Sequence, residues 1–307
     1  MTRFFIVGPT ATGKSEIAAD VAREAGAEIV SADAFQIYRG LDLLTAKPEA
    51  QSVAKAPHHL IGMLPLTEAM NAEKYRRAAT CAIEEINSRG KLAIVVGGSG
   101  LYIKALTHGL APLPESDPKL REKLNTMSLD NLRAQLVELD PEAAKKIDIK
   151  NRRRLVRALE ICLITGKPAS EVVAGVGDSG RPGSIIRTNG AFVFRDREEL
   201  YQRINQRVET MFARGVIEEV RTAAETSATA SQMIGLREIR ELLAGKKSLP
   251  QCIAEIQQAT RRYAKRQLTW FRRQSNFLPL NLSFLTHNEA VKWISLRILS
   301  EARTRDD

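Results

Sequence analysis

The sequence carries a complete phosphate-binding loop close to its start, Gly8-Pro9-Thr10-Ala11-Thr12-Gly13-Lys14-Ser15. Its glycines let backbone N–H groups turn around an anion at a helix N-terminus, which favours negative charge. Lys14 adds a positive charge, and the Ser15 hydroxyl is placed to ligate Mg²⁺. Residues 4–7 before the loop are predicted as a buried strand and residues 16–25 after it as a helix, the context that this motif requires. The pattern predicts a binding site for a diphosphate or a triphosphate.

Asp33 directly follows the second predicted strand, residues 27–31. In a parallel sheet it would lie at the same edge as the phosphate loop, where such sheets bind ligands. Three roles are open on position alone: a ligand of Mg²⁺, a general base facing the phosphate site, or an aspartate that caps a helix or turn.

A second glycine-rich turn, Gly97-Gly98-Ser99-Gly100, follows the buried strand predicted at residues 91–96. Its glycines either allow close packing beside the first loop or bring the Ser99 hydroxyl to the ligand. Nucleotide hydrolases usually have an aspartate at the end of such a strand. The glycines in its place argue against a motor ATPase.

Strands and helices alternate through the first third of the chain, which is typical of a parallel α/β sheet. Three prolines within residues 112–118 mark a boundary; the pattern is then helical to about Gly166, and residues 172–189 are rich in Gly and Ser. We therefore predict an α/β core, residues 1–111 and 191–307, interrupted by a helical insertion at 112–190. The other elements expected are an extended segment at 58–63, a helix at 71–89 with Tyr75, Ala79, Ala82, Ile83 and Ile86 on its buried stripe, a strand at 191–195, and helices at 198–213, 250–274 and 284–303. The helix at 250–274 is expected to bury Ile253, Ile256, Thr260, Tyr263, Gln267 and Trp270.

Basic residues gather in two clusters of this 307-residue chain, which has a net charge of +10 and a pI near 9.6. The first cluster contains Lys150, Arg152, Arg153, Arg154 and Arg157. The second contains Arg261, Arg262, Lys265, Arg266, Arg272 and Arg273, with Tyr263, Trp270 and Phe271 among them. One such cluster is usually a solvated face, but two, one of them with aromatic rings, favour contact with a nucleic-acid backbone and its bases.

The cysteines and the hydropathy indicate the compartment. Cys81, Cys162 and Cys252 lie far apart and form no CxxC pair, which favours a reducing compartment and argues against a zinc site. No apolar run approaches the ~20 residues of a membrane span, and residues 4–7 are too few for a secretory signal. We expect a cytoplasmic protein. Adjacent His58 and His59 would point to opposite faces of a strand, and we interpret them as structural.

The order of these motifs resembles that of the tRNA dimethylallyltransferases (tRNA isopentenyltransferases) over nearly the whole chain. The matching segments are GPTATGKS (8–15), SADAFQIYRG (31–40), TAKP (45–48), HHL (58–60), VGGSGLY (96–102), RRLVRALEICLITGK (153–167), RDREELYQRINQRV (195–208) and TRRYAKRQLTWFR (260–272). Eight ordered segments are far more specific than one phosphate loop. The chain has no cysteine spacing typical of the zinc finger in eukaryotic members, so the resemblance is to the bacterial type.

The resemblance implies a P-loop NTPase-like parallel sheet with a helical insertion domain. It also implies transfer of a dimethylallyl group from dimethylallyl diphosphate to N6 of the adenosine 3′ of the tRNA anticodon. The phosphate loop would then hold the donor's diphosphate, with Mg²⁺ on Ser15. Arg207 would be a further diphosphate ligand, Ser99 would lie near the bridging oxygen, and Asp33 would be the base at N6. Lys14, Arg207 and Mg²⁺ would stabilise the charge on the departing pyrophosphate.

The family pattern further implies a set of residues for tRNA binding. This set is Asp33, Ala34, Phe35, Gln36, Ser99, Arg121, Arg153, Arg154, Arg157, Gln232, Gly235, Arg237, Lys265, Arg266, Gln267, Trp270 and Arg272. The partner would be the anticodon stem-loop, and the protein is expected to be a monomer. Four positions depart from the usual family residue: Ala34 replaces Ser, Leu44 replaces Gly, Ser99 replaces Thr and Leu236 replaces Tyr.

Three other functions remain open at this point. A related prenyltransferase could modify free adenine nucleotides, although a mononucleotide does not need the two basic clusters. A P-loop kinase would turn over ATP without RNA and would use Asp33 as a metal ligand. A non-catalytic RNA-binding protein would bind tRNA without prenylating it.

Overall fold

The computed structural model describes residues 3–110, 113–148, 150–175, 189–274 and 277–303. The chain divides into two compact units, one formed by Met1–Thr107 with Ile186–Asp307 and the other by His108–Ile185. The first unit is an α/β domain with a P-loop NTPase-like fold, which confirms the predicted fold class. Most of the Gly- and Ser-rich segment predicted at 172–189 lies outside the described residues.

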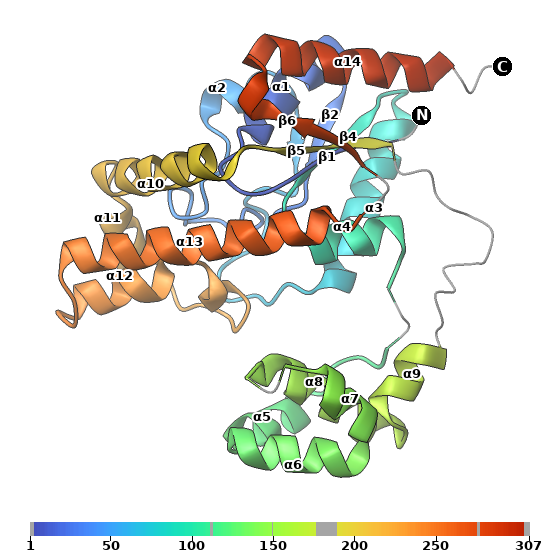
Figure 1. Cartoon of the computed structure of the whole chain (residues 1–307), viewed down its shortest axis with the longest axis vertical. Helices are drawn as coiled ribbons and strands as arrows, with labels where there is room; N and C mark the ends of the chain where they lie inside the picture. The colour runs from blue at the N-terminus through green and yellow to red at the C-terminus, as the bar shows by residue number, and fades with distance from the viewer. Residues whose placement is uncertain (1–2, 111–112, 149, 176–188, 275–276, 304–307) are drawn as a thin grey trace. The chain divides into compact units, whose positions relative to one another are not determined.

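A six-stranded parallel sheet forms the centre of the first unit, in the order β3-β2-β4-β1-β5-β6 (Figure 1). The strands are β1 (Arg3–Val7), β2 (Glu28–Ser31), β3 (His58–His59), β4 (Ala93–Gly97), β5 (Gly190–Phe194) and β6 (Leu278–Asn281). The predicted strands are confirmed to within a few residues. Edge strand β6 was not predicted, because four residues that include Pro279 give little strand signal.

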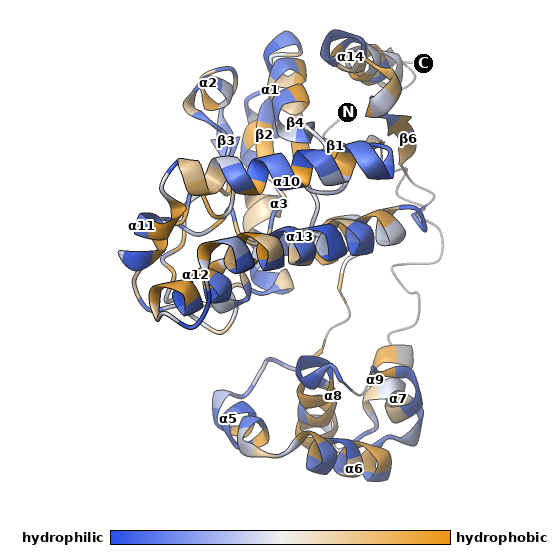
Figure 2. Cartoon of the chain, turned by 60° about the vertical axis from the view of Figure 1, so that its left-hand side comes forward, coloured by the Kyte–Doolittle hydropathy of each residue, from blue (hydrophilic) through white to orange (hydrophobic). Residues whose placement is uncertain are grey.

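Helices cover both faces of this sheet, because successive residues of a strand point to opposite faces and both sets are apolar. Phe4 and Ile6 of β1 face the side covered by α1 (Lys14–Glu24) and α14 (His287–Arg303), whereas Phe5 and Val7 face the other helices. Figure 2 shows apolar strands at the centre and hydrophilic residues along α10 and α13. The remaining helices of this unit are α2 (Ala50–Val53), α3 (Ala72–Ser88), α4 (Gly100–Thr107), α10 (Arg197–Ala213), α11 (Val216–Arg221), α12 (Leu236–Leu243) and α13 (Leu249–Phe271), with short 3₁₀ turns η1 (Ala230–Gln232) and η2 (Leu282–Phe284).

The two longest helix predictions differ in accuracy. Helix α3 buries the five residues predicted for its stripe. Helix α13 instead buries Cys252, Ile256, Ala264, Gln267 and Phe271, so the predicted stripe was wrong at Ile253, Thr260, Tyr263 and Trp270, which are only half-buried. A stripe displaced by one residue uses small Cys and Ala side chains, which the choice of large residues overlooked.

The second unit consists of helices α5 (Pro118–Thr126), α6 (Leu129–Leu139), α7 (Pro141–Lys146), α8 (Arg152–Thr165) and α9 (Ala169–Gly175). Leucines 132 and 136 of α6 pack against Leu155 and Leu159 of α8 in its core. Helix α9 was not predicted. It begins after Pro168, and Asp140 accepts hydrogen bonds from both the backbone N–H and the hydroxyl of Ser170 in its first turn.

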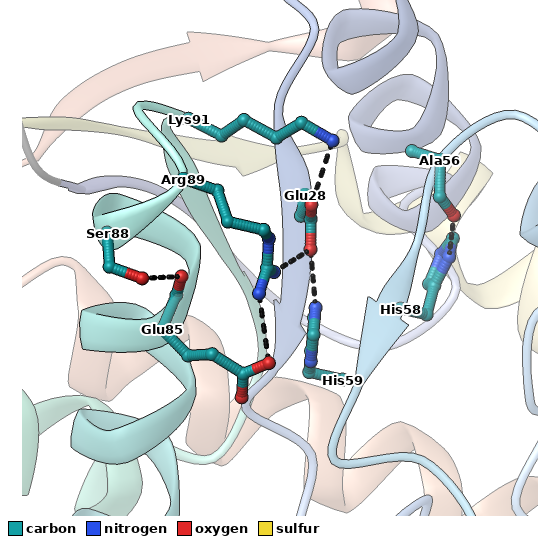
Figure 3. Close-up of polar contacts among 8 residues, drawn as sticks. All are labelled: Glu28, Ala56, His58, His59, Glu85, Ser88, Arg89 and Lys91. Atoms are coloured by element: carbon teal, nitrogen blue, oxygen red, sulfur yellow. Dashed lines mark hydrogen bonds and ion pairs between the residues drawn. The ribbon is translucent and has the colours of Figure 1, made fainter.

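A cluster of charges anchors the start of β2 at the end of the sheet away from the phosphate loop (Figure 3). The buried Glu28 carboxylate contacts His59 at 2.8 Å, Arg89 at 2.8 Å and Lys91 at 3.0 Å, and these partners lower its pKa to about 2 although burial opposes the shift. His58 points elsewhere, its Nδ1 donating to the Ala56 carbonyl oxygen at 2.7 Å. Within the described residues, no group of three or more His, Cys, Asp or Glu could hold a metal ion, and no helix is long and apolar enough to cross a membrane.

Candidate active site

The phosphate loop connects β1 to α1 and has the backbone conformation of an anion cradle. Gly8 (φ 155°), Ala11 (φ 63°) and Gly13 (φ 91°) have positive φ angles. A Cβ atom on Gly8 would lie 2.0 Å from the carbonyl oxygen of Val193, so β5 passes too close for any side chain there. Gly13 ends the loop in the left-handed conformation at the N-terminus of α1, where backbone N–H groups favour an anion.

Two basic side chains converge on this loop from different parts of the chain. The Lys14 Nζ donates to the Pro9 carbonyl oxygen at 3.2 Å, and Arg207 of α10 donates to the Thr10 hydroxyl at 2.8 Å. Burial lowers the pKa of Lys14 to about 8; the positive charge of Arg207 adds to this shift and the Asp33 carboxylate opposes it. Burial also lowers the pKa of Arg207, again against the attraction of Asp33. Lys14, Arg207 and Asp33 are thus electrostatically coupled.

Two further arginines hold the loop and were missed by the sequence reasoning, although both lie in the RDREELYQRINQRV segment. Arg195 donates from Nε to the Thr12 carbonyl oxygen at 2.9 Å, and Arg203 donates from Nε to the Ala11 carbonyl oxygen at 2.9 Å. Arg203 and Arg207 are four residues apart and therefore share a face of α10. That spacing was the available signal.

Asp33 combines two of the roles that its position left open. Its Oδ1 accepts from the backbone N–H of Phe35 at 2.9 Å and of Gln36 at 3.3 Å, so it caps the turn that follows β2. No hydrogen bond within the described residues occupies its Oδ2, and Asp33 lines the cavity described below. The carboxylate is therefore oriented by its backbone while one oxygen stays available to a ligand.

The second glycine-rich turn packs closely between β2 and α13. A Cβ would lie 2.2 Å from the Ala32 oxygen at Gly97, 2.2 Å from the Gln267 amide nitrogen at Gly98, and 2.7 Å from the Trp270 ring at Gly100. These glycines are therefore required by close packing. The Ser99 hydroxyl accepts from the Ala34 backbone N–H at 2.9 Å and is hydrogen-bonded to Tyr263.

Gln267 joins the two glycine-rich loops. Its carbonyl oxygen accepts from the Thr10 backbone N–H at 3.0 Å, and its amide nitrogen donates to the Gly98 oxygen at 2.9 Å. The side chain is buried, so helix α13 fixes both loops through a single residue. The Thr10 N–H is consequently directed to Gln267.

A cavity of about 830 Å³ opens beside the phosphate loop and brings the chemical groups of the site together. Asp33, Lys14, Ser15 and Arg207 all line it. Its other walls are the segment 39–49 and the face of α10 that carries Arg203, Gln206, Arg207, Thr210 and Met211. The cavity is large enough for a small ligand that carries several phosphate groups and a short apolar part.

A missed residue, Glu219 of α11, fixes the 39–49 segment. Its two carboxylate oxygens accept from the backbone N–H groups of Leu43 at 2.8 Å and Leu44 at 2.9 Å. Leu44 itself is buried, and its side chain fills the space beside Gly235, where a Cβ would lie 2.9 Å from it. The departure from the usual glycine at position 44 is therefore accommodated by packing.

The other residues expected to contact tRNA lie mostly on the surface of the first unit. Gln232, Arg237, Lys265, Arg266 and Arg272 are exposed, Trp270 is half-buried, and Gly235 and Leu236 are buried. Arg237 is paired with Glu238 at 2.7 Å, and the Arg266 guanidinium lies 5.8 Å from the Tyr263 ring centre. Ala34, Phe35 and Gln36 form the turn after β2, and the Gln36 amide donates to the Ala46 oxygen at 2.9 Å.

The arginines of the second unit fall into two kinds. Arg121 and Arg157 both pair with the fully buried Glu160, and Arg157 also donates to the Pro114 carbonyl oxygen. Arg153 and Arg154 of the same helix are exposed. Arg121 and Arg157 thus neutralise a buried acid, and Arg153 and Arg154 remain directed to solvent.

The fold and the site define a P-loop α/β protein whose cavity joins a phosphate cradle, three uncompensated cations and a capped carboxylate. The family model described as IPP transferase matches residues 36–274. The chain is 43% identical over 273 residues to tRNA dimethylallyltransferase 1 of Citrifermentans bemidjiense (88% of each chain) and 41% identical over 297 residues to the tRNA dimethylallyltransferase of Geobacter sulfurreducens (94% of this chain, 90% of the relative). The chain therefore belongs to the IPP transferase family.

Solved structures agree with this assignment. The tRNA isopentenylpyrophosphate transferase of Bacillus halodurans superimposes with a TM-score of 0.69 at 32% identity and covers 99% of each chain. A eukaryotic dimethylallyltransferase described as acting on tRNA superimposes with a TM-score of 0.73 at 26% identity, over 92% of this chain and 74% of that one. The predicted family is confirmed, and the assignments of roles to single residues stay predictions.

Proposed function

We propose that this protein transfers the dimethylallyl group of dimethylallyl diphosphate to N6 of the adenosine 3′ of the anticodon in tRNA. The observation that carries this proposal is the single cavity in which Asp33 meets Lys14, Ser15 and Arg207. A phosphate site beside an available carboxylate oxygen suits a reaction that releases pyrophosphate and removes a proton. Family membership supplies the identities of the donor and the acceptor.

In the proposed reaction, the N6 amine attacks C1 of the dimethylallyl group as the C1–O bond breaks. The electron pair of that bond leaves with pyrophosphate, and N6 loses one proton. The amine is a weak nucleophile because its lone pair is delocalised into the ring, so Asp33 Oδ2 would orient it and accept its proton. The N–H groups of Phe35 and Gln36 fix Oδ1 and so direct Oδ2 at the cavity.

The leaving pyrophosphate gains negative charge in the transition state. Lys14, Arg207 and the loop N–H groups are held in place before the reaction, and preorganised donors of this kind stabilise such charge most effectively. The Ser99 hydroxyl would lie at the side of the cavity near the bridging oxygen. Its hydrogen bonds to Ala34 and Tyr263 fix it there.

Mg²⁺ is proposed as the cofactor, held by the Ser15 hydroxyl and the donor's phosphate oxygens. Mg²⁺ usually keeps several water ligands and needs only one or two protein groups when a substrate supplies phosphate, so the residues present fit it without an acidic cluster. The cation would neutralise part of the diphosphate charge. Ser15 lines the cavity together with Lys14, which places the two groups suitably for this purpose.

The exposed basic residues of α13 and α8 are proposed to hold the anticodon stem-loop by its phosphates, with Trp270 available for stacking. The acceptor base must leave its stack to reach the cavity. We propose that the insertion, residues 112–190, contributes Arg153 and Arg154 to tRNA binding. A monomeric cytoplasmic enzyme completes the proposal.

One incubation tests the function. Purified protein, dimethylallyl diphosphate and Mg²⁺ are incubated with bulk tRNA, or with AMP and ATP, and digested nucleosides are analysed by mass. The proposal predicts isopentenyladenosine from tRNA alone. Modification of the free nucleotide alone would indicate an adenylate prenyltransferase, and turnover of ATP without RNA would indicate a kinase.

A further inference from the structure

Three arginines approach the phosphate loop from β5 and α10, and each binds a different loop residue. Arg195 donates to the Thr12 oxygen, Arg203 to the Ala11 oxygen, and Arg207 to the Thr10 hydroxyl, at 2.8–2.9 Å. These contacts fix the position of all three guanidinium groups. The family pattern implied a substrate role only for the last of the three.

The charges of these arginines are balanced differently. Arg195 forms an ion pair with Glu199 at 2.5 Å and donates to the Leu282 oxygen at 2.9 Å. Arg203 has no carboxylate within ion-pair distance among the described residues, and its own charge helps to lower the pKa of Arg195. A half-buried guanidinium without an anion is costly, since it loses water without gaining a counter-charge. The position of Arg203 therefore favours an anionic ligand.

The geometry indicates where that anion would bind. The contact with Ala11 uses only Nε of Arg203, so its terminal Nη groups remain for a ligand. One of them, Nη2, lies 3.5 Å from the point that a Cβ on Gly13 would occupy, beside the first turn of α1. Arg203 also lines the same cavity as Lys14 and Arg207. Its free N–H groups thus lie next to the backbone N–H groups that open the helix.

We propose that Arg203 is a direct ligand of the diphosphate, gripping its oxygens on the side of the loop formed by residues 11–13 while Arg207 binds from the Thr10 side. The identification of the diphosphate as the prenyl donor's rests on the proposed function. A diphosphate monoester carries about three negative charges near neutral pH, and Lys14, Arg203 and Arg207 supply three positive ones. Arg195 is the positioning residue, because Glu199 neutralises it and its contacts hold the loop to the end of the sheet.

A purely structural role for Arg203, as support for the left-handed Ala11, is the competing explanation. The variants R203Q and R203K separate the two explanations. Lysine keeps the charge but loses the planar fork, whereas glutamine keeps some hydrogen bonding and loses the charge. R197Q is the matched control, because Arg197 is exposed on the same helix and its guanidinium lies 5.3 Å from the Tyr201 ring centre.

The test is calorimetric binding of inorganic pyrophosphate with Mg²⁺ to each full-length protein, with a melting curve for each. R203Q should bind pyrophosphate roughly 10–100-fold more weakly than the wild type, since each bond to a charged group contributes that much. R203K should lose less, R197Q should stay within about twofold, and tRNA affinity should not change. Wild-type pyrophosphate affinity in folded R203Q would overturn the inference, as would an equal loss in R197Q.

The same samples distinguish this inference from the proposed function. If the wild type binds pyrophosphate through Arg203 but transfers no prenyl group to tRNA, the proposed function fails and the assignment of Arg203 stands. If the wild type prenylates tRNA and R203Q shows an unchanged KM for dimethylallyl diphosphate, the assignment of Arg203 fails alone.

Discussion

Replacement of Asp33 by Asn separates its chemical role from its structural one. An asparagine retains the Oδ1 that caps Phe35 and Gln36, so the turn after β2 should keep its conformation. It cannot accept the N6 proton. Loss of a general base typically costs 10²–10⁴-fold in turnover, so D33N should lower kcat by roughly that factor with little change in tRNA affinity.

The assay is single-turnover transfer from labelled dimethylallyl diphosphate, with tRNA binding measured separately by filter retention. D117N is the matched control: Asp117 also accepts from two backbone N–H groups, those of Lys119 and Leu120, but caps α5 of the other unit. It should transfer at the wild-type rate. If D33N loses as much tRNA affinity as turnover, or if it turns over like D117N, the reasoning about the base is refuted.

Three further outcomes are expected. Because burial gives Lys14 a pKa of about 8 in the free protein, pyrophosphate affinity should be level below that pH and fall above it, as calorimetry across pH 6.5–9.5 would detect; a flat profile would contradict this. E28Q should lower the free energy of unfolding by about 1–3 kcal/mol at pH 7, and the difference should shrink as pH falls from about 4.5 towards 2, where the wild-type carboxylate also becomes protonated. The double variant R153A/R154A should weaken tRNA binding and reduce the salt dependence of its logarithm by about one for each lost phosphate contact; an unchanged slope would remove this helix from the interface.

Features encoded in short contiguous segments could be predicted from the sequence. The loop 8–15, the position of Asp33 after a strand and the five-residue stripe of α3 all follow from local patterns. The roles expected for Arg207 and Ser99 came from the resemblance to a family, since no spacing in this chain links them to the loop.

Contacts between distant segments could not be predicted from local pattern. Arg203 reaches Ala11 across 192 positions, Gln267 reaches Thr10 across 257, and Glu219 reaches Leu43 across 176. Such pairs depend on how α10, α11 and α13 pack around the sheet. In the basic cluster of α8, likewise, only packing decides that Arg157 pairs with buried Glu160 while its neighbours face solvent.

The most direct test of the central claim uses two anticodon stem-loop RNAs that differ only in the base 3′ of the anticodon. One carries adenosine and the other guanosine, which has no N6 amine. With labelled dimethylallyl diphosphate and Mg²⁺, the proposed reaction predicts label in the adenosine RNA alone and release of one pyrophosphate for each prenyl group transferred. Equal labelling of both RNAs, or pyrophosphate release without labelled RNA, would contradict prenyl transfer to that adenosine.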